Sequence, residues 1–192
     1  SQLGPTAAVT KIRKYTLELY KELEKKVGHS AGLRLNGALS IAQNQGRWEE
    51  LKRQATTAQL YDVDVRILDK AQIKKECPIV NTDEVLGGIL MPGDGAADPS
   101  GVTHMLAKAA KMEGAQIFEK SPVEKILTRN GKIAGVRVNG QEIECEYIVL
   151  ASGMWSRQIG EKVGVSIPLY PAEHFYIITE PIENLSKTLP TI

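Results

Sequence analysis

Residues 171–180, PAEHFYIITE, hold the side chains best suited to proton chemistry. Along an extended chain, successive side chains alternate between two faces, so His174 and Tyr176 share a face. Residues two apart on a strand lie roughly 7 Å apart, and at that spacing both could touch one small substrate. Histidine exchanges protons near neutral pH, and a tyrosine hydroxyl donates or accepts a hydrogen bond. The segment therefore predicts either a substrate-binding pair or a purely structural His–Tyr pair.

A turn of small residues, Ala151-Ser152-Gly153, is the second candidate. Residues 147–150 before it are nearly all apolar, which is typical of a strand buried on both faces. A helix that holds Trp155 is predicted after it. Small residues at the carboxyl end of a buried strand let a ligand approach the main chain, and the helix start offers unpaired N–H groups. The pattern allows a ligand contact, and a tight strand-to-helix turn is the simpler interpretation.

Two acidic positions have simpler interpretations. Asp98 precedes Pro99, which is typical of an N-cap followed by proline at the first helical position. The turn at residues 93–95, Gly-Asp-Gly, could form a phosphate cradle, but it lacks a GxGxxG or P-loop pattern. An ordinary turn without a ligand is therefore favoured. His29 follows a predicted helix and His104 lies within one, and both are assigned structural roles.

Composition excludes several classes of function. The chain has 192 residues, a net charge of +1 and 24% charged residues of both signs, so no nucleic acid or anionic membrane is predicted as a partner. No apolar run approaches the roughly 20 residues of a membrane span. Cys77 and Cys145 are not spaced for a metal, and no disulfide or metal site is expected. No apolar signal core is visible near Ser1, so secretion is not expected.

Elements that would position these residues follow from periodicity and turn residues. Helices are predicted from Thr6 to Gly28, over 47–60, after a cap at Asp69, from Asp98 to Gly114, and from the 151–153 turn to Gly164. Strands are predicted at 32–42, 65–68, the LGGILM run, 115–120, 147–150 and 167–179. Asn-Gly turns at 130–131 and 139–140 predict a β-meander over 122–146.

This order indicates a mixed sheet rather than a regular βαβ alternation. The predicted fold class is α+β, with a mixed, largely antiparallel sheet, helices packed on it and a β-meander. From the residues alone, the sequence indicates a mixed α/β segment with a turn that could face a nucleotide.

Three blocks, taken together and in order, resemble one family. These are GLRLNGALSIA, GDGAADPSGVTHMLAKAAKMEGAQIFEKSPVEKI and YIVLASGMWSRQIGEKVGVSIPLYPAEHFYIITEPI. They are similar to the dimethylglycine/sarcosine dehydrogenase branch of the D-amino-acid-oxidase-like flavoproteins. The resemblance covers essentially the whole chain, and the last block is the most specific because the ASGMWS turn and the P-x-E-H-x-Y segment occur together.

The resemblance implies FAD as the cofactor. It implies that Pro122 and Val123 lie at a bend whose backbone faces the adenosine half. It implies that the ribose and pyrophosphate are lined by Ala151, Ser152, Gly153 and Trp155. His174 and Tyr176 would lie on the substrate-domain sheet above the flavin ring.

The implied reaction is oxidation of the C–N bond of dimethylglycine or sarcosine. A hydride equivalent leaves the N-methyl carbon for the flavin, and the iminium is hydrolysed or passed to tetrahydrofolate. His174 would bind or deprotonate the amine, and Tyr176 would orient it. Oxygen or a transfer flavoprotein would reoxidise the flavin. The alternatives are another amine or amino-acid oxidase of the same superfamily, and a non-catalytic module that binds small molecules.

The resemblance also marks what these residues lack. The family's first strand, its GxGxxG and its acidic ribose ligand do not occur here, and the histidine that carries covalent flavin would lie upstream. The resemblance therefore implies an internal fragment with little or no activity alone. It implies part of a substrate domain at 1–95, part of the FAD domain at 96–165 and a return to the substrate domain at 166–192. The expected compartment is the bacterial cytoplasm or the mitochondrial matrix.

Overall fold

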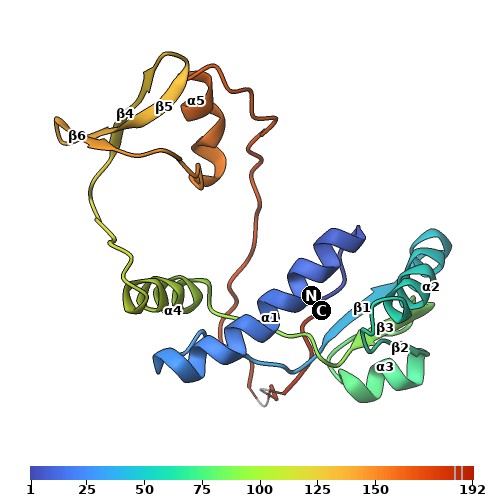
Figure 1. Cartoon of the computed structure of the whole chain (residues 1–192). Helices are drawn as coiled ribbons and strands as arrows, with labels where there is room; N and C mark the ends of the chain where they lie inside the picture. The colour runs from blue at the N-terminus through green and yellow to red at the C-terminus, as the bar shows by residue number, and fades with distance from the viewer. Residues whose placement is uncertain (184, 187) are drawn as a thin grey trace. The chain divides into compact units, whose positions relative to one another are not determined.

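The computed structural model describes residues 1–192 except 184 and 187 (Figure 1). Its contacts divide the chain into two compact units. The first unit is Ser1–Gln116 with Glu183–Ile192, and the second is Ile117–Ile182. Helices and antiparallel strands make up both units, which confirms the predicted fold class. The predicted domain limits concern the complete protein and stay a prediction.

The first unit contains a three-stranded antiparallel sheet. Its strands are β1 (Ala38–Ala42), β2 (Arg66–Leu68) and β3 (Gly87–Met91), in the order β1-β3-β2. The central strand β3 is buried along its whole length. A β-carbon on Gly87 would lie 2.7 Å from the Trp48 ring, so glycine at this position lets the indole lie directly against the strand.

Two helices cover opposite faces of this sheet, α2 (Gln45–Gln59) and α3 (Lys70–Glu76). Ile89 and Leu90 are neighbours on β3, so their side chains point to opposite faces. Each belongs to a separate buried cluster, and Figure 1 shows one helix on either side of the strands. The α2 cluster is Ala42, Leu51, Ala55 and Ile89, and the α3 cluster is Leu39, Leu68, Ile73, Cys77, Val85 and Leu90.

The other two helices of this unit begin and end at predicted residues. In α1 (Ala7–Val27), the Thr6 side chain accepts a hydrogen bond from the Val9 N–H, and Gly28 ends the helix with φ of 61°. In α4 (Pro99–Met112), Asp98 caps the first turn as predicted. The predicted helices over 47–60 and after Asp69 are confirmed as α2 and α3.

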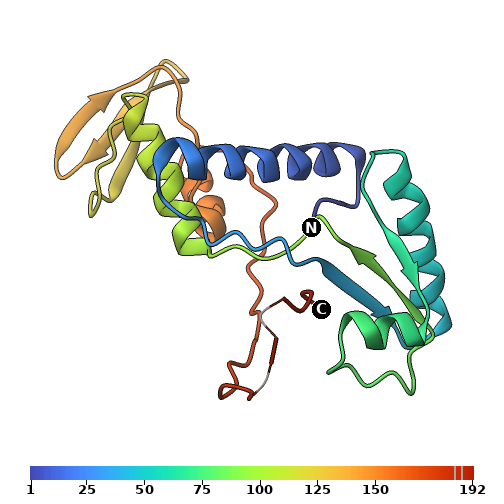
Figure 2. The ribbon, with the colours of Figure 1, turned by 90° about the horizontal axis from the view of Figure 1, so that it is seen from below.

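The C-terminal end of α1 contacts α4 (Figures 1 and 2). Lys26 Nζ lies 2.5 Å from Glu113 Oε1. The hydrogen bond from Lys26 and its positive charge hold the pKa of Glu113 below its usual value. The rings of His29 and His104 meet edge to face, with centroids 6.1 Å apart.

The predicted strand at 32–42 is shorter in the structure. Regular pairing begins at Ala38, because Gly37 has φ of 87° and breaks the extended conformation. Before it, Arg34 makes one isolated bridge to Ala96. The N-terminal half of this segment therefore pairs with the 93–97 turn instead of with β3.

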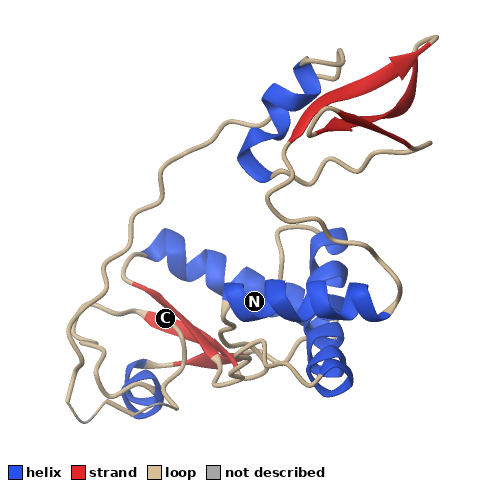
Figure 3. Cartoon of the chain, turned by 90° about the vertical axis from the view of Figure 1, so that its left-hand side faces the viewer, coloured by secondary structure: helices blue, strands red, loops and turns tan. Residues whose placement is uncertain are grey.

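The second unit contains the predicted meander, which is confirmed (Figure 3). Its strands are β4 (Val123–Arg129), β5 (Lys132–Val138) and β6 (Gln141–Glu144). In the turns at 130–131 and 139–140, all four residues have φ between 49° and 75°. Positive φ at both central residues is the conformation that Asn-Gly favours in tight hairpins.

The helix predicted after the 151–153 turn is present but short. A 3-10 turn, η1 (Gly153–Trp155), leads into α5 (Ser156–Glu161). A β-carbon on Gly160 would lie 2.8 Å from the Val165 carbonyl oxygen, so the chain after α5 folds back closely on it. Gly164, with φ of 76°, makes that return possible.

Three predicted strands do not form, at 115–120, 147–150 and 167–179. Each prediction rested on apolar composition or alternation, but a strand also needs a neighbour to complete its hydrogen-bond ladder. Among the described residues, no strand pairs with any of the three. Their side chains are open to solvent instead, with Val149 88% and Ile177 90% exposed, so the expected burial of 147–150 on both faces is wrong for this chain.

Candidate functional site

The predicted adenosine bend lies at the start of the meander. Pro122 directly precedes β4, and Val123 is its first residue. Val123 is 54% exposed, and its backbone pairs with that of Val138 on β5. The bend therefore presents one edge of the meander at which a flat ligand could contact the main chain.

The predicted phosphate-facing turn leaves its main chain open. Ala151 is exposed, and a β-carbon added to Gly153 would meet nothing within 4 Å. Gly153 has φ of 56°, a left-handed conformation that favours glycine. Ser152 Oγ lies 3.0 Å from the Oγ of Ser156, a buried residue on α5, and this hydrogen bond fixes the turn against the helix. Trp155 is 61% exposed beside the turn.

His174 and Tyr176 do not lie on a strand. Both are exposed, Tyr176 by 80%, in a segment without regular secondary structure. Within the described part of the chain, neither side chain makes a hydrogen bond or an ion pair. The second unit thus contains all eight predicted site residues. Among their described contacts with neighbouring elements are the pairing of Val123 with β5 and the hydrogen bond between Ser152 and Ser156 on α5. Their roles stay a prediction.

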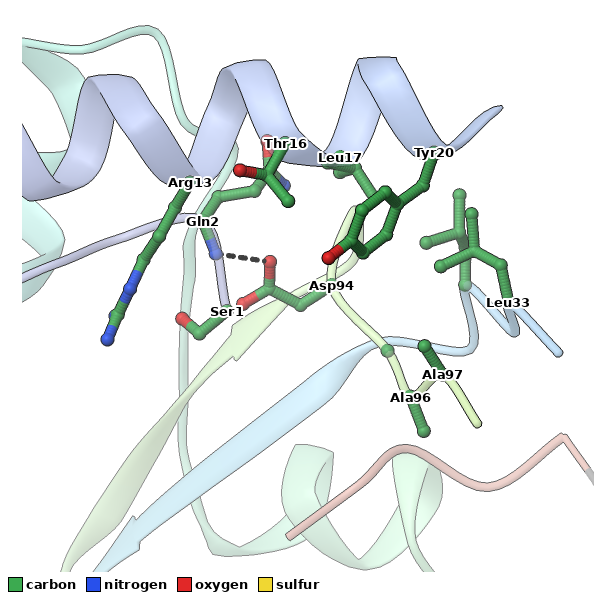
Figure 4. A pocket seen from close by; sticks show the side chains of 12 residues that line it. Ser1, Gln2, Arg13, Thr16, Leu17, Tyr20, Leu33, Asp94, Ala96 and Ala97 are labelled. Carbon is green, nitrogen blue, oxygen red and sulfur yellow. Dashed lines mark hydrogen bonds between the residues drawn. The ribbon is translucent and has the colours of Figure 1, made fainter. Parts of the chain in front are cut away.

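A pocket in the first unit was not predicted. It has a volume of about 420 Å³ and lies beside α1, residues 33–35 and the turn at 93–97 (Figure 4). We call it the Asp94 pocket. The side chains that matter for its chemistry are those of Arg13, Thr16, Leu17, Tyr20, Leu33 and Asp94.

The carboxylate of Asp94 is the unusual group of this pocket. The residue is only 3% exposed. Its Oδ1 accepts a hydrogen bond of 2.8 Å from the Gln2 backbone N–H, whereas its buried Oδ2 has no partner within the described residues. Figure 4 shows the carboxylate on the pocket side of its turn, with the Tyr20 hydroxyl directed toward it. The side chain of Arg13 lines the same pocket and donates from Nη1 to the Leu3 carbonyl oxygen at 2.6 Å.

The sequence offered one weak signal for this pocket, an acidic residue between two glycines at 93–95. The interpretation as a turn is correct, because Asp94 N–H donates to the Met91 carbonyl oxygen at 3.1 Å. A phosphate cradle needs N–H groups that face the ligand, whereas a carboxylate faces the pocket and would repel an anion. Tyr20 and Arg13 gave no signal, since polar side chains on a helix are ordinarily solvent-facing.

Three further features of the described residues bear on other kinds of site. No group of three or more His, Cys, Asp or Glu side chains that could hold a metal ion occurs among them. Cys77 and Cys145 are both free thiols. None of the described helices is both long enough and apolar enough to cross a membrane.

Comparison with known proteins identifies the family. Residues 1–191 match the family described as FAD dependent oxidoreductase, DAO. Human mitochondrial sarcosine dehydrogenase is 32% identical over 100% of this chain and 21% of its own length. The 4-methylaminobutanoate oxidase (formaldehyde-forming) of Paenarthrobacter nicotinovorans is 33% identical over 96% of this chain and 22% of its own length.

One further relative and one solved structure are also similar to this chain. The mouse mitochondrial pyruvate dehydrogenase phosphatase regulatory subunit is 31% identical over 95% of this chain and 21% of its own length. The crystal structure of L-proline dehydrogenase from P. horikoshii superposes with a TM-score of 0.79, with 26% identity over 86% of this chain and 44% of that one. The chain spans about a fifth of the length of these curated relatives. With a family match over nearly every residue, the chain belongs to the DAO family of FAD-dependent oxidoreductases.

Proposed function

We propose that this chain works as part of a longer FAD-dependent enzyme that oxidises the C–N bond of an N-methylated amino acid. One observation carries the proposal: the collinear similarity over 95% or more of the chain to proteins named for such substrates. They include human sarcosine dehydrogenase, at 32% identity, and rat dimethylglycine dehydrogenase, at 29%. The substrate would be sarcosine, dimethylglycine or a close analogue.

FAD, when bound, supplies the acceptor for the hydride equivalent. The residues proposed to hold it have small side chains or free main chain. Ala151 is exposed and Gly153 has open space around its α-carbon, so a pyrophosphate could approach the backbone there without displacing a side chain. Pro122 and Val123 would contact the adenosine half, and Trp155 would lie along the ribose. These features fit a dinucleotide cofactor such as FAD.

His174 is proposed to bind the substrate amine and take its proton. An ammonium ion has no lone pair to assist the loss of hydride from the adjacent carbon, so the amine must be neutral when it reacts. Histidine is the side chain that most often serves as a general acid or base, which suits this transfer. Tyr176 would orient the amine through its hydroxyl. Both side chains are exposed, so both could reach a substrate.

Later steps are proposed from the same similarity. The iminium product would be hydrolysed to formaldehyde and the demethylated amine, or its methylene carbon would pass to tetrahydrofolate in another part of the protein with release of the same amine. Oxygen or a transfer flavoprotein would accept the electrons. Relatives from mitochondria and from a bacterium support the mitochondrial matrix or the bacterial cytoplasm as the compartment.

A second candidate is a regulatory role without catalysis. It is favoured by the similarity to the mouse pyruvate dehydrogenase phosphatase regulatory subunit, at 31% identity, which nearly equals that to the dehydrogenases. Sequence identity over this segment therefore does not separate an enzyme from a regulatory relative.

Anaerobic reduction of the flavin tests the proposal. We expect the complete protein to be purified with bound flavin, and sarcosine or dimethylglycine to bleach its visible absorbance because the substrate passes its electrons to FAD. Glycine, which lacks the N-methyl carbon, is the matched control and should leave the absorbance unchanged. A flavin-loaded protein that no N-methylated amino acid bleaches would contradict the substrate assignment, and protein without flavin would favour the regulatory role.

A further inference from the structure

The hydroxyl of Ser156 is buried in the second unit. Ser156 is the first residue of α5 and is 6% exposed. Gly160, one turn later on the same face of the helix, is buried too, and a β-carbon there would lie 2.9 Å from the Ile167 side chain. The face of α5 that carries Ser156 is therefore packed against the chain that returns after the helix.

The Ser152 and Ser156 hydroxyls share one hydrogen bond, with the two Oγ atoms 3.0 Å apart. A serine hydroxyl has one proton to donate and can also accept through its lone pairs. Within the described part of the chain, Ser156 Oγ has no other hydrogen-bond partner. If Ser152 donated in this pair, the buried Ser156 proton would be left without an acceptor, which is costly. Ser156 is therefore the donor, and the Ser152 proton stays free for another acceptor.

Ser152 can offer this proton to a ligand. It is half-buried in a turn whose other residues, Ala151 and Gly153, are exposed. The backbone holds the turn, because the Trp155 N–H donates to the Ser152 carbonyl oxygen at 3.3 Å and the Ser156 N–H donates to that of Gly153. A hydroxyl that accepts one hydrogen bond is polarised and donates the next one more strongly. Hydrogen bonds to an ionised acceptor are stronger than those to a neutral one, so the free Ser152 proton suits a phosphate oxygen.

We propose that Ser156 is a positioning residue of the cofactor site. Its hydroxyl donates to Ser152 Oγ, and the Ser152 hydroxyl donates to a pyrophosphate oxygen of FAD. Ser156 acts on the cofactor only through Ser152, because its own side chain is buried. This role rests on the proposed function in one respect, the place of the 151–153 turn beside the pyrophosphate, and it is independent of the substrate.

Calorimetric titration with ADP, which carries the same adenosine and pyrophosphate groups as FAD, tests this role. The complete protein is produced in a riboflavin-starved host so that it holds no flavin. Ser152→Ala should weaken ADP binding by about tenfold, because a hydrogen bond to a charged group is lost. Ser156→Ala should weaken it by about threefold, because the Ser152 hydroxyl is no longer oriented and polarised. Ser166→Ala removes an exposed hydroxyl of the same unit and should change nothing.

The double variant is decisive. Ser152→Ala/Ser156→Ala should bind ADP as weakly as Ser152→Ala alone, because Ser156 then has no hydroxyl to orient. Adenosine, which lacks the phosphate groups, should bind every variant as it binds the wild-type protein, and this result would show that the variants keep their fold.

An unchanged ADP affinity in Ser156→Ala, or effects of the two substitutions that multiply in the double variant, would overturn the proposal. Equal losses of ADP and adenosine binding would overturn it too, since they indicate a general disturbance of the fold, and so would a wild-type protein that binds no ADP. Because the readout is nucleotide binding and not flavin reduction, failure of the positioning role and failure of the substrate assignment give different results.

Discussion

His174 is the residue on which the proposed chemistry depends most directly. It is exposed and has no described partner, so neither packing nor a hydrogen bond gives it a structural role in this chain. A structural histidine in a folded protein usually makes such contacts when it is buried. An exposed imidazole is available to bind a substrate.

In the complete protein we expect His174→Ala to slow flavin reduction by about a hundredfold, because a positioned proton acceptor contributes roughly that factor or more. FAD retention should stay unchanged, since the imidazole is not among the residues proposed to hold the cofactor. Stopped-flow absorbance under anaerobic conditions measures the rate, and flavin content after gel filtration measures retention. Tyr176→Phe is the companion variant and should have a smaller effect.

The pH dependence of the His174→Ala variant tests whether His174 takes the proton of the amine or has a structural role. If the imidazole accepts the amine proton, a higher pH should partly restore the rate of His174→Ala, because more of the amine is then neutral in solution. Equal and small effects of the substitution on the reduction rate and on flavin retention would assign His174 a structural role.

For single residues, the sequence predicted a local role such as helix capping, but it did not predict burial. Asp98 was correctly assigned as a helix cap because capping depends on the next three residues alone. The burial of Asp94 could not be predicted, since it depends on Gln2 and on Gly37, which are far away in sequence. Helix capping depends on residues that are adjacent in sequence, whereas burial results from contacts between residues that are distant in sequence.

Among the elements, α4 gives the clearest case of a locally determined start. The Asp98 carboxylate accepts from the Ser100 N–H at 3.2 Å and the Gly101 N–H at 2.9 Å, and Pro99 occupies the first helical turn. These bonds satisfy N–H groups that the helix itself cannot pair. The carboxylate also lies at the positive end of the helix dipole.

We expect Asp98→Ala to lower the free energy of unfolding by about 1 kcal/mol, the usual cost of losing an N-cap. Urea denaturation followed by far-UV circular dichroism measures it. Asp98→Asn keeps an acceptor oxygen at the same place and should lose only a fraction of that amount. If both substitutions left the unfolding midpoint unchanged, α4 would not depend on its cap.

Elements specified by their own turns were predicted correctly, and those that need distant partners were not. The meander formed because its Asn-Gly turns fix positive φ at adjacent residues and so bring the flanking strands together. The runs at 147–150 and 167–179 have strand composition, but nothing in their own residues supplies a neighbouring strand. An apolar run therefore indicates a segment that can become a strand, and a partner decides whether it does.

The two units of the chain differ in how completely they bury apolar side chains. Every buried apolar residue described in the structure lies between Val27 and Met105, in the first unit. In the second unit, the described buried residues are Gly135, Ser156 and Gly160, none of which has a large apolar side chain. Because burial of apolar surface is the main force that stabilises a fold, the second unit lacks a hydrophobic core of its own.

We therefore expect residues 147–150 to become a protected strand in the complete protein. Tyr147 is 86% and Val149 is 88% exposed in this chain, and covering such side chains is favourable by about 25 cal/mol for each Å² of apolar surface removed from water. Hydrogen–deuterium exchange measured by mass spectrometry compares the 192-residue chain with the complete protein. The amides of 147–150 should exchange rapidly in the former and slowly in the latter, whereas β3, buried along its length, should be protected in both. Rapid exchange of 147–150 in the complete, flavin-loaded protein would mean that no rigid strand precedes the turn at residues 151–153. The proposed contact between that turn and the cofactor would then lose its structural support.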